Sequence, residues 1–539
     1  METVGMEGAH VLAAYARAYG LWQQRQLAEA EAVLSDCWRQ CGMQSLRGML
    51  LMAYILRDQK RYVSEMSCLV SLLERFAHSP EASLLAEAWS LLGSVLRMLG
   101  ESRLSVEAFR KSAAVEPDAR QKLVEESNAI FSANAIDPVS ADFMQVLYAE
   151  YRTYLAALPV TLFPARRYGH ARIRVGYLSA DLRDHAVGQF VRALLTQYDP
   201  EAFSVYVYAL SARQDAVTAA LRAGGAQWRE AAGWSFEEIA RAVRRDEIDV
   251  LVDLGGHTAG NALPVFAWRP APVQISGIGY FSSTGIDETT GFLSDVFCAP
   301  QPRSPYFTEP LLRLPQSHFC YQPFSQFPGV GAPPCLRKGY VTFGCFNNFS
   351  KVSDRVLAVW RDLLRAVPGA HLLLKHQLFD SEEGRRYTQR RLRCLGLPLA
   401  CVEMRGLSQD YLAQYHDVDI ALDTRPYTGG LTTCEALYMG VPVVTWIGGY
   451  HGARFGWSFL ANLGLEELAA ADDAAYLAIA AALAGDWDLL RLLRRTLRER
   501  MQRSPLMDAR CYVAEMEALY RALVARERHG GGDVGAFLA

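Results

Sequence analysis

The sequence predicts an α/β protein in which two Rossmann-like domains in tandem follow an all-α helical repeat domain. Residues 1–125 are rich in Ala, Leu, Glu, Arg and Gln and poor in Pro, a composition typical of helices. From residue 173 onward, short apolar runs alternate with helical segments, which indicates a doubly wound parallel sheet. The alternation restarts at Tyr340, after a stretch rich in proline and aromatic residues, and therefore predicts a second sheet.

The first domain, residues 1–125, contains one clear helical repeat that begins WSLLGSVLRMLG. The tetratricopeptide pattern expects W, L, G, Y, F and P at the positions of Trp89, Leu92, Gly93, Leu96, Phe109 and Pro117. Two or three repeats fit this region, with a degenerate first one, and a plain helical bundle is the alternative. Stacked helical hairpins usually present a concave surface to other proteins, so the repeats are expected to contact protein partners.

A helical connector is expected over residues 126–170, and the first Rossmann-like domain over 171–335. Its strands are predicted at 173–178, 203–210 and 248–254. Ligands of such sheets gather at the carboxyl ends of the strands. His185 and His257 each follow a strand in a polar turn, which makes both candidates for the site.

The second Rossmann-like domain is expected over residues 336–528, and a glycine-rich, disordered tail over 529–539. The predicted strands and helices of this domain alternate in the order 340–344, 354–367, 371–375, 381–395, 401–404, 409–416, 420–422 and 443–446. Two facing domains of this kind form a cleft. The architecture alone fits a nucleotide-sugar transferase of the GT-B type, an epimerase or a two-domain binding protein.

The stretch DTRPYTGGLTTCEALYMGVP, residues 423–442, is the strongest local candidate for a ligand site. Gly429 and Gly430 allow a sharp turn and a close approach by a ligand. Thr432 and Thr433 then open a helix, whose first N–H groups favour an anion, and Glu435 follows one turn later. This pattern suits a nucleotide diphosphate and its ribose. The alternative is an ordinary strand–loop–helix joint.

Composition excludes several classes of function. The chain is 51% hydrophobic and 21% charged with a net charge of −3, which argues against a protein that mainly binds nucleic acid or anionic membranes. Eleven scattered cysteines without a C-x-x-C pair suggest reduced thiols in the cytoplasm. Glu2 and Glu7 do not fit a secretory signal. No apolar run reaches about 18 residues, so no membrane-spanning helix is expected.

Residues 173–525 resemble the catalytic region of the O-GlcNAc transferase family, which includes SPINDLY. The matching segments are VGYLSADLRDHAVGQF, LVDLGGHT, RPAPVQISGIGYFSSTG, VTFGCFNNFSKVS and DIALDTRPYTGGLTTCEALYMGVPVVT. They occur in the family's order, behind tetratricopeptide repeats as in the family. The resemblance implies an inverting enzyme that glycosylates Ser or Thr hydroxyls of proteins without a metal or other cofactor. The sequence offers no D-x-D or His/Cys metal motif that contradicts this.

The resemblance implies that Lys351 contacts the donor diphosphate; a solvated surface lysine is the alternative. Thr432 and Thr433 would hold phosphate oxygens, and Glu435 would accept from ribose hydroxyls. Asn348 stands where the animal enzyme has a glutamine that contacts the diphosphate. The full set expected to bind the nucleotide sugar is Asn348, Lys351, Ser408, Tyr411, Gln414, Gly430, Leu431, Thr432, Thr433 and Glu435.

Histidine suits a general base because its ordinary pKa, about 6.5, lies near working pH. His185 matches the family histidine proposed as proton acceptor, and His257 in GGHT is its rival. Either could instead be a structural histidine. A water chain or the donor phosphate could take the proton while the histidine positions groups. His451 follows a glycine turn and either faces the cleft or lies on a surface loop.

Two departures from the family leave the donor open. Tyr411 occupies the place of the usual base-stacking histidine, and Leu431 replaces a histidine of the animal enzyme. UDP-GlcNAc is the first expectation for the donor, and GDP-fucose is the alternative. A repeat scaffold with a degenerate transferase domain, or a transferase for lipid or polysaccharide that uses the basic helix around 491–503, would be competing functions. Protein acceptors are the expected partners, with no nucleic acid and no stable membrane insertion.

Overall fold

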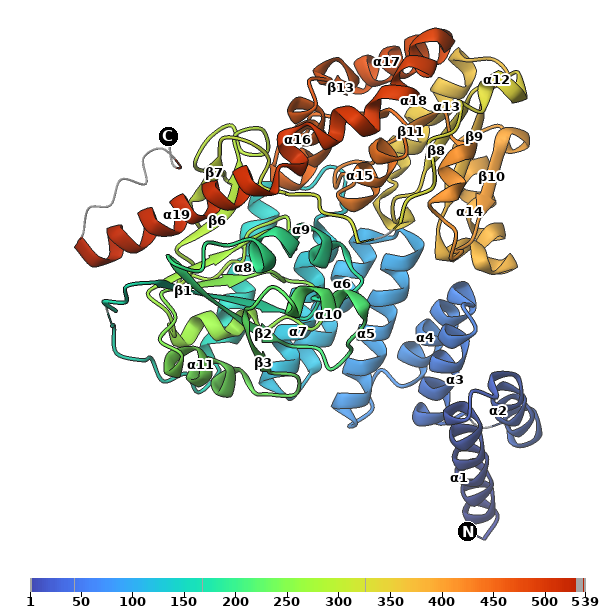
Figure 1. Ribbon diagram of the computed structural model, residues 1–539. Coiled ribbons are helices and arrows are strands. Elements are labelled where there is room, and N and C mark those ends of the chain that lie inside the picture. The colour runs from blue at the N-terminus through green and yellow to red at the C-terminus, as the bar shows by residue number, and fades with distance from the viewer. Residues whose placement is uncertain (1, 43, 167, 325, 530–536, 538–539) are drawn as a thin grey trace.

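A computed structural model describes residues 2–42, 44–166, 168–324, 326–529 and 537. An N-terminal array of helices leads into two α/β domains, and the first helices of that array project from the rest of the molecule (Figure 1). The predicted order of one all-α region followed by two Rossmann-like domains is confirmed.

The helical region contains eight helices within the described residues. They are α1 (Glu2–Gln23), α2 (Leu27–Cys41), α3 (Leu46–Asp58), α4 (Tyr62–Arg75), α5 (Ala82–Leu99), α6 (Ser102–Val115), α7 (Ala119–Ala133) and α8 (Ala141–Ala156). The best repeat is the α5–α6 hairpin. A Cβ atom on Gly93 would lie 2.9 Å from ring atoms of Phe109, so this glycine permits the close packing that the sequence predicts. Helix α6 ends two residues before Pro117, as expected.

The expected boundary at residue 125 falls inside α7, and the residues assigned to a connector form the second half of α7 and then α8. Both helices pack on the first α/β domain. Ser127 of α7 contacts His257 at 3.0 Å, and Tyr148 of α8 contacts Ser282 at 2.9 Å. The last helices of the array therefore pack against the first α/β domain instead of forming a separate connector.

The first sheet has seven parallel strands in the order β3-β2-β1-β4-β5-β6-β7. They are β1 (Ile173–Ser179), β2 (Phe203–Ala209), β3 (Gln227–Glu230), β4 (Val250–Asp253), β5 (Val273–Ser276), β6 (Gly291–Asp295) and β7 (Leu311–Leu314). Its helices are α9 (Ala186–Thr196), α10 (Ala216–Arg222) and α11 (Phe236–Arg245). Strand β7 lies in the stretch rich in proline and aromatic residues, where four buried residues between two prolines form it.

The second sheet has six parallel strands in the order β10-β9-β8-β11-β12-β13. They are β8 (Thr342–Cys345), β9 (His371–Lys375), β10 (Val402–Arg405), β11 (Ile420–Leu422), β12 (Val443–Trp446) and β13 (Ala469–Ala470). The helices are α12 (Cys335–Lys338), α13 (Asp354–Ala366), α14 (Glu382–Cys394), α15 (Leu431–Tyr438), α16 (Phe455–Asn462), α17 (Asp473–Gly485), α18 (Trp487–Gln502) and α19 (Ala509–His529).

The α-helix predicted over 409–416 is wrong. The chain there makes i→i+3 bonds, from Ala413 N–H to Asp410 C=O at 2.9 Å and from Gln414 N–H to Tyr411 C=O at 3.1 Å. These bonds give a turn and a short 3₁₀ helix at Ala413–Asp417 instead. This tighter path brings Tyr411 next to α15.

Helix α19 corrects the assignment of residues 336–528 to the second domain, because it returns to the first (Figure 1). The hydroxyls of Tyr520 and Tyr177 lie 3.0 Å apart, and Glu517 accepts from the N–H of Asp199 at 2.8 Å. The helix therefore ties the end of the chain to β1 and α9. The predicted disordered tail lies outside the described residues except for positions 529 and 537.

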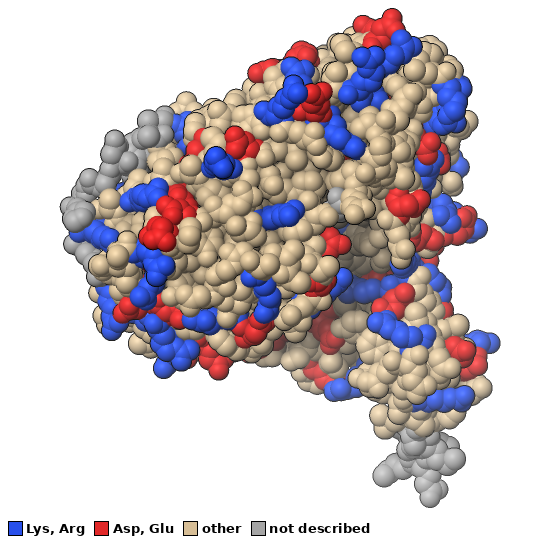
Figure 2. All heavy atoms as spheres, viewed as in Figure 1, with Lys and Arg blue, Asp and Glu red and all other residues tan. Residues whose placement is uncertain are grey.

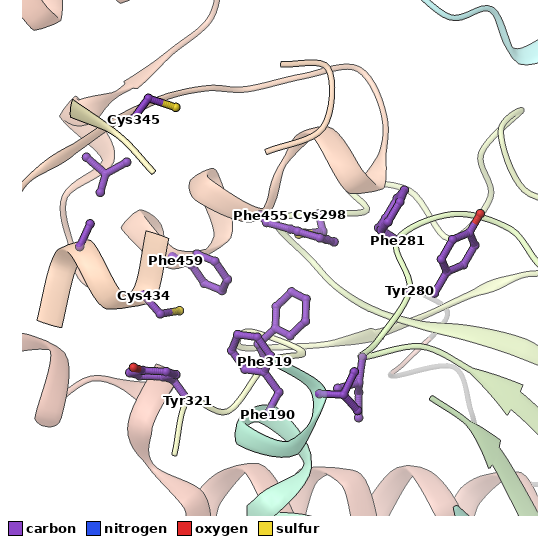
Figure 3. Packing of buried hydrophobic residues seen from close by; sticks show 14 of the residues in the cluster. Phe190, Tyr280, Phe281, Cys298, Phe319, Tyr321, Cys345, Cys434, Phe455 and Phe459 are labelled. Carbon is purple, nitrogen blue, oxygen red and sulfur yellow. The ribbon is translucent and has the colours of Figure 1, made fainter. Parts of the chain in front are cut away.

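The two α/β domains share one apolar core. Phe281 of the first domain stacks on Tyr427 of the second with ring centroids 3.8 Å apart, and Phe319 meets Phe455 at 4.9 Å. Figure 3 shows Phe281 and Phe319 of the first domain and Phe455 of the second in this shared core. These aromatic contacts hold the two domains, and so their two carboxyl edges, in a defined relation.

Among the described helices, α5 alone is long and apolar enough to meet the criterion for a membrane span. Half of that segment is buried, and it packs between α4 and α6. This burial and packing identify α5 as a core helix of the repeat array.

Candidate active site

A buried carboxylate organises the turn that follows β11. Asp423 accepts from the N–H of Gly429 at 2.7 Å, from the side-chain amide of Asn347 at 3.0 Å and from the hydroxyl of Thr445 at 2.7 Å. Desolvation raises the pKa of this carboxyl, and the hydrogen bonds oppose that shift. These bonds fix the glycine turn, and so fix where the next helix begins.

Asn347 is a site residue that the sequence analysis missed. Its amide donates to Asp423 and to Thr424 at 3.2 Å, and its carbonyl oxygen accepts from the hydroxyl of Thr432. It is 6% exposed, whereas its neighbour Asn348 is exposed. Two adjacent asparagines gave no sequence signal to separate them. The fold shows that the first holds the cradle together and the second faces solvent.

Helix α15 begins at Leu431, as the sequence predicts. The backbone N–H groups of Leu431, Thr432 and Thr433 donate to no acceptor in the described part of the chain. A Cβ atom on Gly430 would meet only open space, so a ligand can approach the backbone there. A Cβ atom on Gly429 would lie 2.4 Å from the Thr433 hydroxyl, so only glycine fits that position. This arrangement is a cradle for an anion.

Lys351 lies beside this cradle. Its ammonium donates to the carbonyl of Thr428 at 3.2 Å and lies 3.4 Å from the ring centroid of Tyr427. Desolvation lowers the pKa of Lys351 to about 8, against the opposing pull of Asp423. Lys351 is therefore held by the turn that precedes the cradle, and it is not a solvated surface lysine. A bound diphosphate would lie within the field of this charge.

Tyr411 and Glu435 form a pair. The tyrosine hydroxyl donates to the Glu435 carboxylate at 2.5 Å. Burial raises the pKa of Glu435 to about 7, and the bond from Tyr411 limits that shift. Tyr411 is therefore anchored at its hydroxyl, and one oxygen of the carboxylate expected to bind ribose is already engaged.

The remaining residues of the expected nucleotide set lie close together on the neighbouring loop. Ser408 accepts from the Gln414 amide at 2.6 Å and from the Lys375 ammonium at 3.0 Å. The Gln414 carbonyl oxygen is buried and has no partner within the described residues. Lys375, which the sequence analysis missed, is 5% exposed and also donates to the Gly406 carbonyl at 2.6 Å. An unsatisfied amide oxygen is a candidate contact for a nucleobase donor group.

His185 lies at the start of α9 with its side chain 40% exposed. Its Nδ1 accepts from the N–H of Val187 at 3.3 Å and lies 3.8 Å from the Asp181 carboxylate. Burial lowers the pKa of His185, and Asp181 partly opposes this. Because Nδ1 accepts a hydrogen bond, the neutral ring carries its proton on Nε2. In this tautomer the ring presents a donor to the cleft.

His257 has both ring nitrogens engaged. Nδ1 meets the Ser127 hydroxyl at 3.0 Å, and Nε2 meets the Thr284 carbonyl at 2.8 Å. The side chain is 1% exposed, and burial lowers its pKa to about 4. These bonds leave neither nitrogen for an acceptor hydroxyl, so the geometry favours a structural histidine that joins α7 to the first sheet over the proposed rival base.

The fold also brings together a His/Cys cluster that no sequence spacing revealed. Potential ligand atoms of Cys298, His318 and His451 lie within 4.8 Å of one another, and all three side chains are buried. His318 contacts Asp295 at 2.5 Å, and the Nε2 atoms of both histidines lack partners among the described residues. His451 is thus neither in the cleft nor on a surface loop; it lies behind Phe281, whose carbonyl it contacts at 3.3 Å.

A cavity of about 640 Å³ lies between the repeat helices and the two α/β domains. One wall comes from the loops after β1, β4 and β8, with His185, Thr258 and Asn348. The opposite wall comes from the repeat region, with residues of α3, α4, α5 and α7. Figure 2 shows the surface hollowed between the repeat helices and the α/β domains. A molecule in this cavity would touch all three parts of the chain.

Comparison with known proteins matches the part of the chain that contains the two α/β domains. The model of glycosyl transferase family 41 matches residues 154–330 and 335–516. The probable UDP-N-acetylglucosamine–peptide N-acetylglucosaminyltransferase SPINDLY of Oryza sativa subsp. japonica is 35% identical over 431 residues, which cover 78% of this chain and 46% of that protein. SPINDLY of Arabidopsis thaliana is 38% identical over 357 residues, 65% of this chain and 39% of its own. The chain thus spans about half the length of these relatives or less.

A solved structure matches nearly the whole chain. A point mutant of the O-GlcNAc transferase of Thermobaculum terrenum superposes with a TM-score of 0.83 at 28% sequence identity, over 97% of this chain and 98% of that one. The match includes the helical array and both α/β domains. Together with the extent of the family match, this shows that the chain belongs to glycosyl transferase family 41.

Proposed function

We propose that this protein transfers a sugar from a nucleotide sugar to Ser or Thr hydroxyls of protein acceptors, and that UDP-GlcNAc is the donor. The observation that carries the proposal is the cradle at the start of α15, with free N–H groups beside Lys351 and an adjoining cavity walled by repeat helices. Relatives whose names state this activity, and the O-GlcNAc transferase structure, support it.

In the proposed reaction the acceptor oxygen attacks the anomeric carbon of the sugar. The new carbon–oxygen bond forms as the bond from that carbon to the diphosphate breaks, with inversion. The nucleoside diphosphate leaves with the electron pair, and the acceptor hydroxyl loses its proton. Lys351 and the N–H groups of Leu431–Thr433 would stabilise the charge that grows on the diphosphate. No metal is proposed for this step.

His185 is proposed to position groups with its Nε2–H rather than to take the proton directly. The bond from Val187 to Nδ1 motivates this assignment. A base role would require the other tautomer, with Nδ1–H turned to Asp181. If His185 only positions groups, the donor phosphate or a water chain removes the proton of the acceptor hydroxyl.

GDP-fucose is the second candidate donor. Tyr411, bonded to Glu435, replaces the ring expected to stack on the base, so the base pocket differs from the family pattern. An assay of nucleotide release from UDP-GlcNAc and from GDP-fucose, with mass spectrometry of the modified proteins, decides between them. A protein that releases nucleotide from neither donor, and modifies no protein of its host, would be a scaffold instead of an enzyme.

A further inference from the structure

The repeat side of the cavity contains an arginine without an anionic partner. Three arginines line the cavity: Arg57, Arg97 and Arg183. Arg57 pairs with Glu65 at 2.7 Å, and Arg183 pairs with Asp181 at 3.0 Å.

Arg97 is the exception. It forms no ion pair, and its side chain donates no hydrogen bond, within the residues that the structure describes.

The position of Arg97 is well defined nonetheless. Its guanidinium carbon lies 5.3 Å from the ring centroid of Phe131 and 5.7 Å from that of Phe109. These rings hold the side chain by cation–π contacts while leaving its five N–H donors unused. Burial, and secondarily the nearby Arg57, lower the pKa of Arg97, so the local environment disfavours its charge. A guanidinium stays charged in proteins, and this one therefore lacks a counter-charge.

The charged residues around Arg97 do not supply this counter-charge. Glu65 is fully buried, and its Oε1 is occupied by Arg57. Its Oε2 has no hydrogen-bond partner among the described atoms, so the glutamate does not reach Arg97. The repeat wall thus presents two guanidinium groups against one carboxylate. A ligand that brings one negative charge would balance it.

The wall on which Arg97 lies favours the acceptor over the donor as the source of that charge. Thr432 and Thr433, at the start of α15, do not line this cavity, whereas His185 and Asn348 face it from the catalytic side. A donor diphosphate on α15 would leave the repeat wall free. Val95 and Met98 of the same helix add apolar surface that suits an extended peptide.

We propose that Arg97 binds a carboxylate of the protein acceptor, so that the enzyme prefers Ser or Thr with an Asp or Glu close by in the acceptor. The inference rests on the proposed function, because it names the acceptor class for the same site. Arginine binds carboxylates through two parallel hydrogen bonds, and this geometry gives specificity as well as affinity.

The test uses the full chain and synthetic peptides with one Ser. A single Asp is scanned through the flanking positions, and each peptide is paired with its Asn counterpart. At one position or more, the Asp peptide is expected to show a kcat/KM roughly tenfold above that of its Asn partner. Arg97→Gln should bring this ratio to about one, Arg97→Lys should leave an intermediate ratio because it keeps charge without the fork, and Arg97→Glu should favour Lys peptides.

Arg103 is the matched control. It is exposed on α6, it does not line the cavity, and Arg103→Gln should keep the wild-type ratio. Equal rates for Asp and Asn peptides at every position, or a ratio unchanged in Arg97→Gln, would overturn the inference. So would weaker UDP or GDP binding by Arg97→Gln with an unchanged peptide ratio, since that result places Arg97 on the donor. Absence of nucleotide release and of transfer by the wild type would instead refute the proposed function itself.

Discussion

The carboxyl edges of the two sheets are built differently. On the second sheet, Asp423, Asn347 and Thr432 form a closed polar network beside which the backbone N–H groups of α15 and Lys351 are placed to meet a diphosphate. On the first sheet, His257 is locked by two hydrogen bonds, while His185 is partly exposed and uses one. In the proposed reaction, this difference would give a preorganised donor side and a less constrained acceptor side. Rigid dipoles stabilise a developing charge best when they need no rearrangement.

The largest expected effect tests the donor side. Lys351→Ala should lower kcat/KM by roughly 10²–10³, the usual cost of losing one preorganised charge-stabilising group. Lys338→Ala is the control, because this lysine lies at the amino end of β8, where it contacts Thr342 and Asp417. Steady-state kinetics of nucleotide release measure both variants. Full activity in Lys351→Ala would remove this residue from the site.

The next effect tests the acceptor side. His185→Ala should lower kcat by about tenfold to a hundredfold, since a positioning hydrogen bond is worth less than an essential base. Its stability should change by about 1 kcal/mol, because only one N-cap bond is lost. A loss of 10⁴ in kcat with an unchanged melting curve would instead identify His185 as the base.

A pH profile connects the two sides. The charged form of Lys351 exists below its pKa of about 8, so kcat/KM should fall as pH rises through 8, by about tenfold at one unit above it. The lowered pKa of His185 keeps its ring neutral, so the acid limb that this ring contributes should lie below the ordinary histidine value of about 6.5, apart from any limb near 7 that Glu435 contributes. Lys351→Arg, if active, should lose the alkaline limb. An alkaline limb that stays at 8 in that variant would assign it to another group.

The smallest expected effect on turnover concerns His257. His257→Ala should lower the free energy of unfolding by roughly 3 kcal/mol, because it opens a cavity and leaves the Ser127 hydroxyl and the Thr284 carbonyl without their partner. The folded fraction should keep kcat within a few-fold of wild type. Denaturant unfolding and kinetics below the midpoint measure the two quantities. A large loss of kcat at unchanged stability would restore His257 as a catalytic candidate.

Local sequence features predicted those parts of the site that one segment contains. Gly429, Gly430 and the start of α15 followed from residue types at fixed spacing, since a glycine turn and a helix start are local structures. The α5–α6 repeat followed from a short consensus for the same reason. The predicted helix over 409–416 was wrong, because its periodicity did not reveal the i→i+3 bonds that form there.

Contacts between distant segments decided the features of the fold and the site that no single segment contains. The sequence by itself determined a helical array followed by two parallel sheets, and a candidate anion site after β11, because periodicity and turn chemistry are encoded residue by residue. Only the tertiary structure showed that Asn347, and not Asn348, holds the cradle. It also showed that a serine of α7 contacts His257 and that α19 packs on the first domain. Hydrogen bonds and burial join residues far apart in the chain, and such pairings decide which of two similar side chains remains free to meet a substrate.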